Sequence, residues 1–159
     1  MPAETAERQV ARFMARYAPE VVRVAKGARQ RVRALLPGAV EIVYDNYNAL
    51  AIGFGPSERA SEAIVSLALY PRWVSLFLLR GKGLPDPHKL LRGSGSRVRH
   101  IVLESAEVLD RAPVKALVRA AVAASPKPIA PGSRRRVVVR SVSAKQRPRR
   151  PAAAKKRNS

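Results

Sequence analysis

The stretch VEIVYDNYNALAIGF, residues 40–54, decides the fold. Its first six residues follow the two-residue period of a β-strand, with the even positions 40–44 on one face and the odd positions 41–45 on the other. A second strand is predicted at 49–54. Residues 45–48, Asp-Asn-Tyr-Asn, are typical of a turn between the two, because Asn and Asp tolerate positive φ. The stretch therefore predicts an antiparallel hairpin.

The chain that follows continues the strand pattern. Residues 63–69 and 73–79 are rich in Val, Ile, Leu and aromatic side chains, and Pro71-Arg72 separates them as a turn. Residues 81–97 are interrupted by glycine and proline, which indicates an irregular loop. Residues 98–103 alternate again and predict a fifth strand.

Helices are predicted on both sides of these strands. Apolar residues recur at helical spacing over 4–17 and again over 20–36, and Pro19 suits the first turn of the second helix. A last helix is expected after Asp110, a good N-cap residue, with Pro113 tolerated in its first turn. The order predicts an α+β domain over 1–125, with a mainly antiparallel sheet of about five strands packed by two N-terminal helices and one C-terminal helix. No βαβ alternation supports a dinucleotide-binding fold.

Charge separates the chain into two parts. Residues 1–125 hold 19 basic and all 11 acidic residues, a net charge of +8, whereas residues 126–159 hold 12 basic residues and no acid. A segment of one charge repels itself and is rich here in proline, so residues 126–159 are predicted to be a disordered tail. Residues 136–140, Arg-Val-Val-Val-Arg, are the one local exception and could form a transient strand.

Such a tail attracts polyanions, and nucleic acid is the first candidate. The expected contacts are Arg134, Arg135, Arg136, Arg140, Lys145, Arg147, Arg149, Arg150, Lys155, Lys156 and Arg157. These clusters would neutralise phosphates without reading bases, and the absence of aromatic residues from the tail gives no support for stacking on single strands. An anionic lipid surface and a tail without a partner are the alternatives.

Several other classes are not supported. The chain has no cysteine, so disulfides, thiolate metal sites and a cysteine nucleophile are excluded. Residues 1–16 contain Glu4 and Glu7 and no apolar run, which is not typical of a signal peptide. No stretch approaches the ~20 apolar residues that a membrane-spanning helix needs. We therefore expect a cytoplasmic protein without a membrane span.

The body resembles the YdhG-like family of small bacterial domains of unknown function. The resemblance rests on the helical pair, the hairpin around residues 44–48, the string Leu69-Tyr70-Pro71, the run at 91–100 and the helix after Leu109-Asp110, and it covers residues 8–124. It implies an α+β fold with helices on an antiparallel sheet, and no established reaction. Some relatives are labelled frataxin-like iron chaperones. That role would need clustered carboxylates, whereas the acids of this chain are scattered, so neither a metal nor a cofactor is expected.

One small polar pocket is a candidate ligand site. If the ends of the hairpins converge, aromatic and polar side chains could line it; they are Tyr44, Asp45, Asn46, Tyr47, Tyr70, Trp73, Arg99 and His100. Turn-forming residues and aromatic filling of the core explain the same residues more simply. The string at 93–97, Gly-Ser-Gly-Ser-Arg, could hold an anion but lacks the ending of a phosphate-binding P-loop.

No arrangement of residues typical of catalysis is present. The sequence therefore favours a non-enzymatic accessory domain attached to nucleic acid by its basic tail, whose body binds another partner or forms a homodimer. We expect the arginines of the second helix to lie on a solvent-exposed face that could extend the basic surface; they are Arg23, Arg31 and Arg33. The alternative is a domain that binds a small ligand or a metal, in which the tail is incidental.

Overall fold

The computed structural model describes residues 4–130 and 132–152. The chain forms three α-helices, three short 3₁₀ helices and six strands in this part. In order they are α1 Ala6–Met14, α2 Pro19–Leu35, β1 Val40–Asp45, β2 Leu50–Gly55, η1 Ala60–Glu62, β3 Val65–Leu69, β4 Val74–Leu78, η2 Gly81–Gly83, β5 Arg99–Leu103, η3 Ala106–Asp110, α3 Ala112–Ala124 and β6 Arg136–Val142. The predicted α+β class and all five predicted strands are confirmed, with ends that differ by one or two residues.

The six strands form one mixed sheet in the order β5-β4-β3-β2-β1-β6. Strands β1 to β5 pair with their neighbours in the chain and are antiparallel. Strand β6 joins the outer edge of β1 in the parallel direction. The prediction of a mainly antiparallel sheet is thus confirmed, but the sheet has one more strand than the five expected.

The register places the largest apolar side chains on one face of the sheet. Leu50, Ile52 and Phe54 of β2 are fully buried there, and they lie beside Leu67 of β3 and its neighbours at alternate positions. Because side chains alternate along a strand, the intervening residues face the other way. These are smaller on the two central strands, where Ala51 lies opposite Ala68 and Gly53 opposite Ser66.

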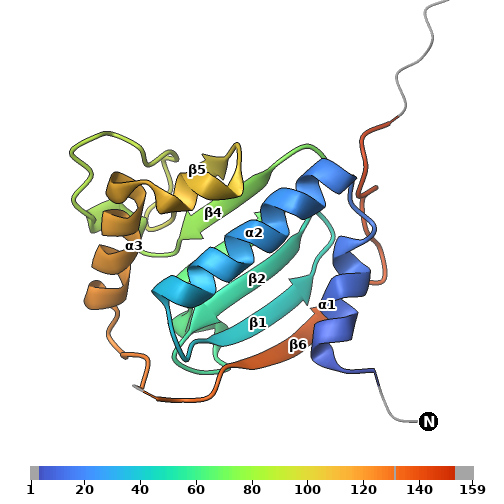
Figure 1. Cartoon of the computed structure of the whole chain (residues 1–159), viewed down its shortest axis with the longest axis horizontal. Helices are drawn as coiled ribbons and strands as arrows, with labels where there is room; N and C mark the ends of the chain where they lie inside the picture. Colours follow the sequence, from blue (N-terminus) through green and yellow to red (C-terminus); the bar gives the residue numbers. More distant parts are fainter. Residues whose placement is uncertain (1–3, 131, 153–159) are drawn as a thin grey trace, which may run out of the picture.

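Two helices lie on the apolar face. Helix α2 crosses the sheet, and α1 lies next to it over β6 (Figure 1). Thr5 caps the start of α1, since its hydroxyl oxygen accepts from the Arg8 amide, and α2 begins at Pro19, which needs no amide partner in the first turn.

Helix α3 differs from the predicted arrangement. It packs mainly against η3 and α2, beyond the end of the sheet, and not across the strands (Figure 1). The physical reason is space: α2 has 17 residues and is therefore about 25 Å long, so it occupies the middle of the apolar face. The apolar stripe of α3 is buried instead in the same core at its margin.

The C-terminal segment also requires a correction. Residues 136–142 were predicted to belong to a disordered tail, with at most a transient strand at 136–140, whereas they form β6, so the domain continues past residue 125. The local run of three valines is what makes a strand favourable, and the free edge of β1 supplies its partner. Within the described residues, no helix is long and apolar enough to cross a membrane.

Candidate nucleic-acid interface

Strand β6 carries the first part of the predicted basic tail along the edge of the sheet. Val137 and Val139 lie beside Glu41 and Val43 of β1 on the face that the helices cover. The register then shifts between Val43 and Tyr44, which leaves Arg140 as an extra residue in a β-bulge. The strand thus partly buries Val137 and Val139 and keeps Arg140 exposed.

Arg149 fastens the segment that follows β6. Arg149 is only 4% exposed, and its Nη2 donates to Asp45 Oδ1 at 3.0 Å. The same guanidinium donates to the main-chain carbonyls of Asn46 and Tyr47 and lies 5.7 Å from the centre of the Tyr17 ring. Arginine suits such a site because its planar fork serves several acceptors and stacks on a ring. Arg149 is therefore an anchor, and its assignment as a nucleic-acid contact is corrected.

Hydrogen bonds to main-chain carbonyls of the β1–β2 hairpin hold the same segment in place. The amide of Ser143 donates to the Asp45 carbonyl at 2.9 Å, and the amide of Arg147 donates to the Tyr47 carbonyl at 2.8 Å. Gln146 Nε2 donates to the Asp45 carbonyl at 3.0 Å. These contacts satisfy hairpin groups that the sheet itself leaves unpaired, so residues 143–150 follow a defined path over the hairpin.

The remaining basic residues between 134 and 150 face solvent. Arg136 is paired with Glu58 at 2.9 Å, and six others have no ion-pair partner among the described residues. We call these six the basic strip: Arg134, Arg135, Arg140, Lys145, Arg147 and Arg150. The strip runs from the start of β6 to the end of the anchored segment. Lys155, Lys156 and Arg157, which the sequence analysis included, lie outside the described residues.

The predicted ligand pocket is brought together only in part. Asn46, Tyr47 and Tyr70 line an open groove of ≈ 520 Å³ on the sheet face that α1 and α2 leave uncovered. Tyr44 shares that face, and Trp73 stacks on Tyr70 with 4.8 Å between ring centres. We call this hollow the aromatic groove; its other lining residues include Ala51, Ser66, Ala68, Phe77, Leu79 and Ser143.

Three of the predicted pocket residues make their contacts outside the aromatic groove. Asp45 is buried under Arg149 on the helix-covered side. His100 lies on the groove side but packs against Phe77, with 5.5 Å between ring centres, outside the groove lining. Arg99 donates to the carbonyls of Gly95 and Val98 at 2.6 and 2.8 Å and so braces the glycine-rich loop.

The glycine-rich loop borders a second, smaller recess. Arg80, Lys82, Ser96 and Arg97 line an open hollow of ≈ 410 Å³, and the Lys82 amide donates to the Arg97 carbonyl at 3.0 Å. A side chain at Gly81 would collide with Arg99, because an added Cβ would lie 2.6 Å from the Arg99 Cβ. The loop is therefore held close to η2, and its cations are exposed.

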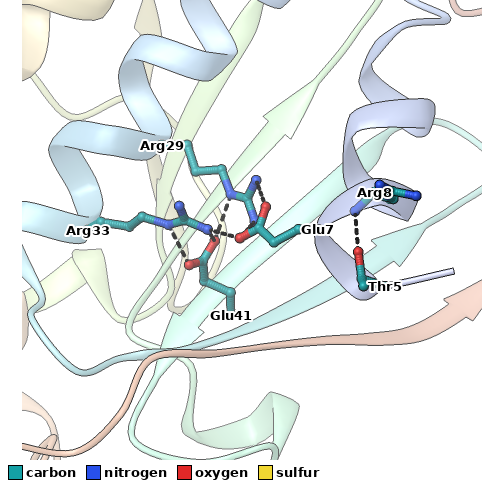
Figure 2. A network of polar contacts seen from close by, with 6 residues as sticks. All are labelled: Thr5, Glu7, Arg8, Arg29, Arg33 and Glu41. Atoms are coloured by element: carbon teal, nitrogen blue, oxygen red, sulfur yellow. Dashed lines mark hydrogen bonds and ion pairs between the residues drawn. The ribbon is translucent and has the colours of Figure 1, made fainter.

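A buried ion cluster joins α1, α2 and β1 (Figure 2). Glu41 has no exposed surface and accepts from Arg29 Nε at 2.7 Å and from Arg33 Nε at 2.6 Å. Glu7 contacts the same two arginines from α1. Partial burial raises the pKa of Glu7, but the hydrogen bonds and charges of Arg33 and Arg29 outweigh it and hold the pKa below its ordinary 4.5.

Two of the three α2 arginines that were predicted to form a solvated face, Arg31 and Arg33, are therefore paired instead, whereas Arg23 is exposed as predicted. Arg33 is bound to Glu41 and Glu7, and Arg31 pairs with Asp110 at 3.1 Å. These charges are already compensated and add little to a basic surface. A signal was available in the sequence, since Glu41 and Asp45 share the face of β1 that also carries the core residue Val43. Buried carboxylates require cationic partners.

Comparison of the chain with protein-family models, curated proteins and solved structures finds no match. The resemblance to the YdhG-like family stays a prediction.

Proposed function

We propose that the chain is a nucleic-acid-binding accessory protein whose basic strip holds the phosphate backbone without reading sequence. The observation that carries the proposal is the strip itself: six exposed cations, without acidic partners in the described residues, on a segment held in place by β6 and Arg149. A regular array of cations gains affinity by releasing the counterions condensed on a nucleic acid. It acts by binding rather than by catalysis.

The way the strip is mounted favours this function over a merely solubilising tail. Arg140 lies six positions after Arg134, which is about 20 Å along an extended strand. Holding like charges on a folded surface costs self-repulsion, which a free tail would relieve by spreading out. A polyanion bound along the strip removes that cost.

The test is a salt series of fluorescence anisotropy with a labelled DNA duplex. If all six cations of the strip contact phosphates, log Kobs falls against log salt with a slope of about −5. The variant Arg140→Gln, Lys145→Gln, Arg147→Gln should make that slope shallower by about 3, since each lost phosphate contact reduces the size of the slope by about 1. Its matched control is Arg23→Gln, Lys26→Gln, Arg119→Gln, which removes three exposed cations of α2 and α3 that have no ion-pair partner within the part of the chain that the structure describes.

The control variant should bind as the parent chain does. An equal loss in both variants would mean that net charge alone attracts the duplex, and the strip would have no special role. Absence of binding near physiological salt would reject the proposal.

The aromatic groove supports a second candidate function, a small-ligand domain with an incidental basic segment. Its volume lies within the range of known ligand pockets, ~300–1,000 Å³. Native mass spectrometry of the purified chain distinguishes the two functions: a retained small molecule whose loss follows Tyr70→Ala supports this candidate, and a chain of bare mass opposes it. A metal ion is less favoured, because no three His, Asp or Glu side chains gather suitably in residues 4–130 and 132–152.

A further inference from the structure

The fold brings aromatic side chains to a basic segment that contains none in its own sequence. Arg147 of the basic strip lies with its guanidinium 5.8 Å from the centre of the Tyr47 ring. Ser143, between Arg140 and Lys145, lines the aromatic groove directly. The strip therefore borders the groove at Arg147 and Ser143, so that a cation and an aromatic ring lie side by side although they are far apart in the chain.

The groove is a consequence of the register. On the face opposite the helices, β2 and β3 present Ala51, Gly53, Ser66 and Ala68, whereas β4 presents Phe77. Small residues between larger ones leave a hollow, which Tyr47 and Tyr70 close at the hairpin end. Its volume of ≈ 520 Å³ is large enough for planar groups to enter from solvent.

Two aromatic side chains at this end of the sheet are poorly covered by the chain. Tyr47 is 48% exposed, and Trp73, stacked on Tyr70, is 44% exposed. Exposed aromatic rings beside cations are the combination that unpaired bases recognise, because the base stacks on the ring while its phosphate meets the cation. A duplex cannot use the rings in this way, since its bases are already stacked on one another.

We propose that the aromatic groove takes the unpaired bases of a single-stranded nucleic acid whose phosphates lie on the basic strip. The inference rests on the proposed function and names its substrate class. Charge complementarity selects this occupant over an acidic or apolar protein surface: no carboxylate is among the described residues that line the groove, and Asp45 of the adjoining hairpin is buried on the opposite face and paired with Arg149.

Tyr47→Ala tests the stacking contribution. Its ring is half exposed, and the variant keeps its main-chain carbonyl, which accepts from the Arg147 amide and from the Arg149 guanidinium; what is lost is the ring and its contact with the Arg147 guanidinium. We expect about fivefold or greater weakening for a single strand of about 16 nucleotides and no change for a duplex of the same length. The matched control Tyr47→Phe keeps the ring and should bind both as the parent does.

A second variant blocks the groove without touching its rings. Ser66→Leu places a larger side chain on the floor of the groove, where Ser66 is half buried. It should likewise weaken single-strand binding and leave duplex binding unchanged. Circular dichroism and the unfolding midpoint of each variant confirm that the fold is intact. Single strands of oligo(U) and oligo(dT) are both used, to identify which sugar the chain takes.

The salt series separates this inference from the proposed function. Stacking does not depend on ions, so Tyr47→Ala should lower the affinity for single strands by the same factor at every salt concentration, whereas strip variants change the slope. Unchanged single-strand affinity in Tyr47→Ala and Ser66→Leu, with duplex and single strand bound alike, would overturn the inference and leave the strip intact. Loss of duplex binding in Tyr47→Ala would overturn it as well.

Discussion

Arg149 and Asp45 form the contact on which the path of the C-terminal segment depends. Both side chains are nearly inaccessible, and they join positions 104 residues apart. Arg16 approaches the second Asp45 oxygen only to 3.6 Å, so Arg149 is the main partner of this carboxylate. Removing one member of a buried pair leaves the other charge buried without compensation, which costs more than the pair itself contributes.

Asp45→Asn should therefore lower the free energy of unfolding by roughly 3–5 kcal/mol. Urea unfolding followed by circular dichroism measures it. The control is Asp110→Asn, which breaks the exposed pair with Arg31 and should cost less than about 1 kcal/mol. Equal effects of the two substitutions would contradict the assigned role of Asp45. The double variant Asp45→Asn, Arg149→Met should recover part of the loss, because it leaves no uncompensated charge.

At the scale of elements, β6 is held by two partly buried valines, Val137 and Val139, that pack against the core. Val139 packs against the core beside Val43, whereas Val142 at the end of the strand is 53% exposed. The two positions have the same side chain and differ in burial, which makes them a matched pair for substitution.

Val139→Asp should destabilise the domain by roughly 2 kcal/mol or more, because it puts an unpaired carboxylate against apolar neighbours. Val142→Asp should change stability by no more than about 0.5 kcal/mol. Urea unfolding of both variants provides the comparison. If residues 136–142 were detached from the sheet in solution, the two substitutions would have the same small effect.

The ion cluster of α1, α2 and β1 makes the docking of these elements depend on acid. The folded chain holds the pKa of Glu7 below 4.5, so the stability that Glu7 contributes is complete above pH 4.5 and is lost as the pH falls through the lowered pKa. We expect Glu7→Gln to lose less stability than the parent chain between pH 4.5 and lower pH. Thermal unfolding across this range measures it, with the exposed Glu20→Gln as control. A parallel fall in Glu7→Gln and the parent would contradict the prediction.

At the scale of the whole molecule, the net charge of +20 acts against compactness. Like charges spread over one small domain repel one another, and salt screens that repulsion. Most of the surface ion pairs are exposed and contribute little, so their screening is the smaller effect.

We therefore expect the midpoint of thermal unfolding to rise as sodium chloride is added, by about 2–4 °C for each kcal/mol of repulsion relieved. Scanning calorimetry at several salt concentrations measures the rise. The variant with Gln at positions 140, 145 and 147 carries less charge and should show a smaller rise. A midpoint that falls with salt would mean that specific ion pairs outweigh the net repulsion.

The core of the fold was largely predictable. The alternation at 40–45, the turn at 45–48 and the prolines at 19 and 37 act within a few residues, and they placed β1, β2 and α2 nearly as observed. The position of α3 was not predictable, because its apolar stripe fits a sheet or another helix equally well. The candidate site was predicted as two separate features, a basic tail and an aromatic pocket, since each has its own local composition.

The sequence by itself determined the helices, the five antiparallel strands and the concentration of positive charge after residue 126, because periodicity, turn residues and charge are local properties. Only the tertiary structure decided that residues 136–142 extend the sheet, that Arg149 is buried, and that Arg147 lies over Tyr47. These contacts join positions about a hundred residues apart, and they form because β1 has a free edge and Asp45 a buried charge to compensate. No local pattern in the basic segment encodes either partner.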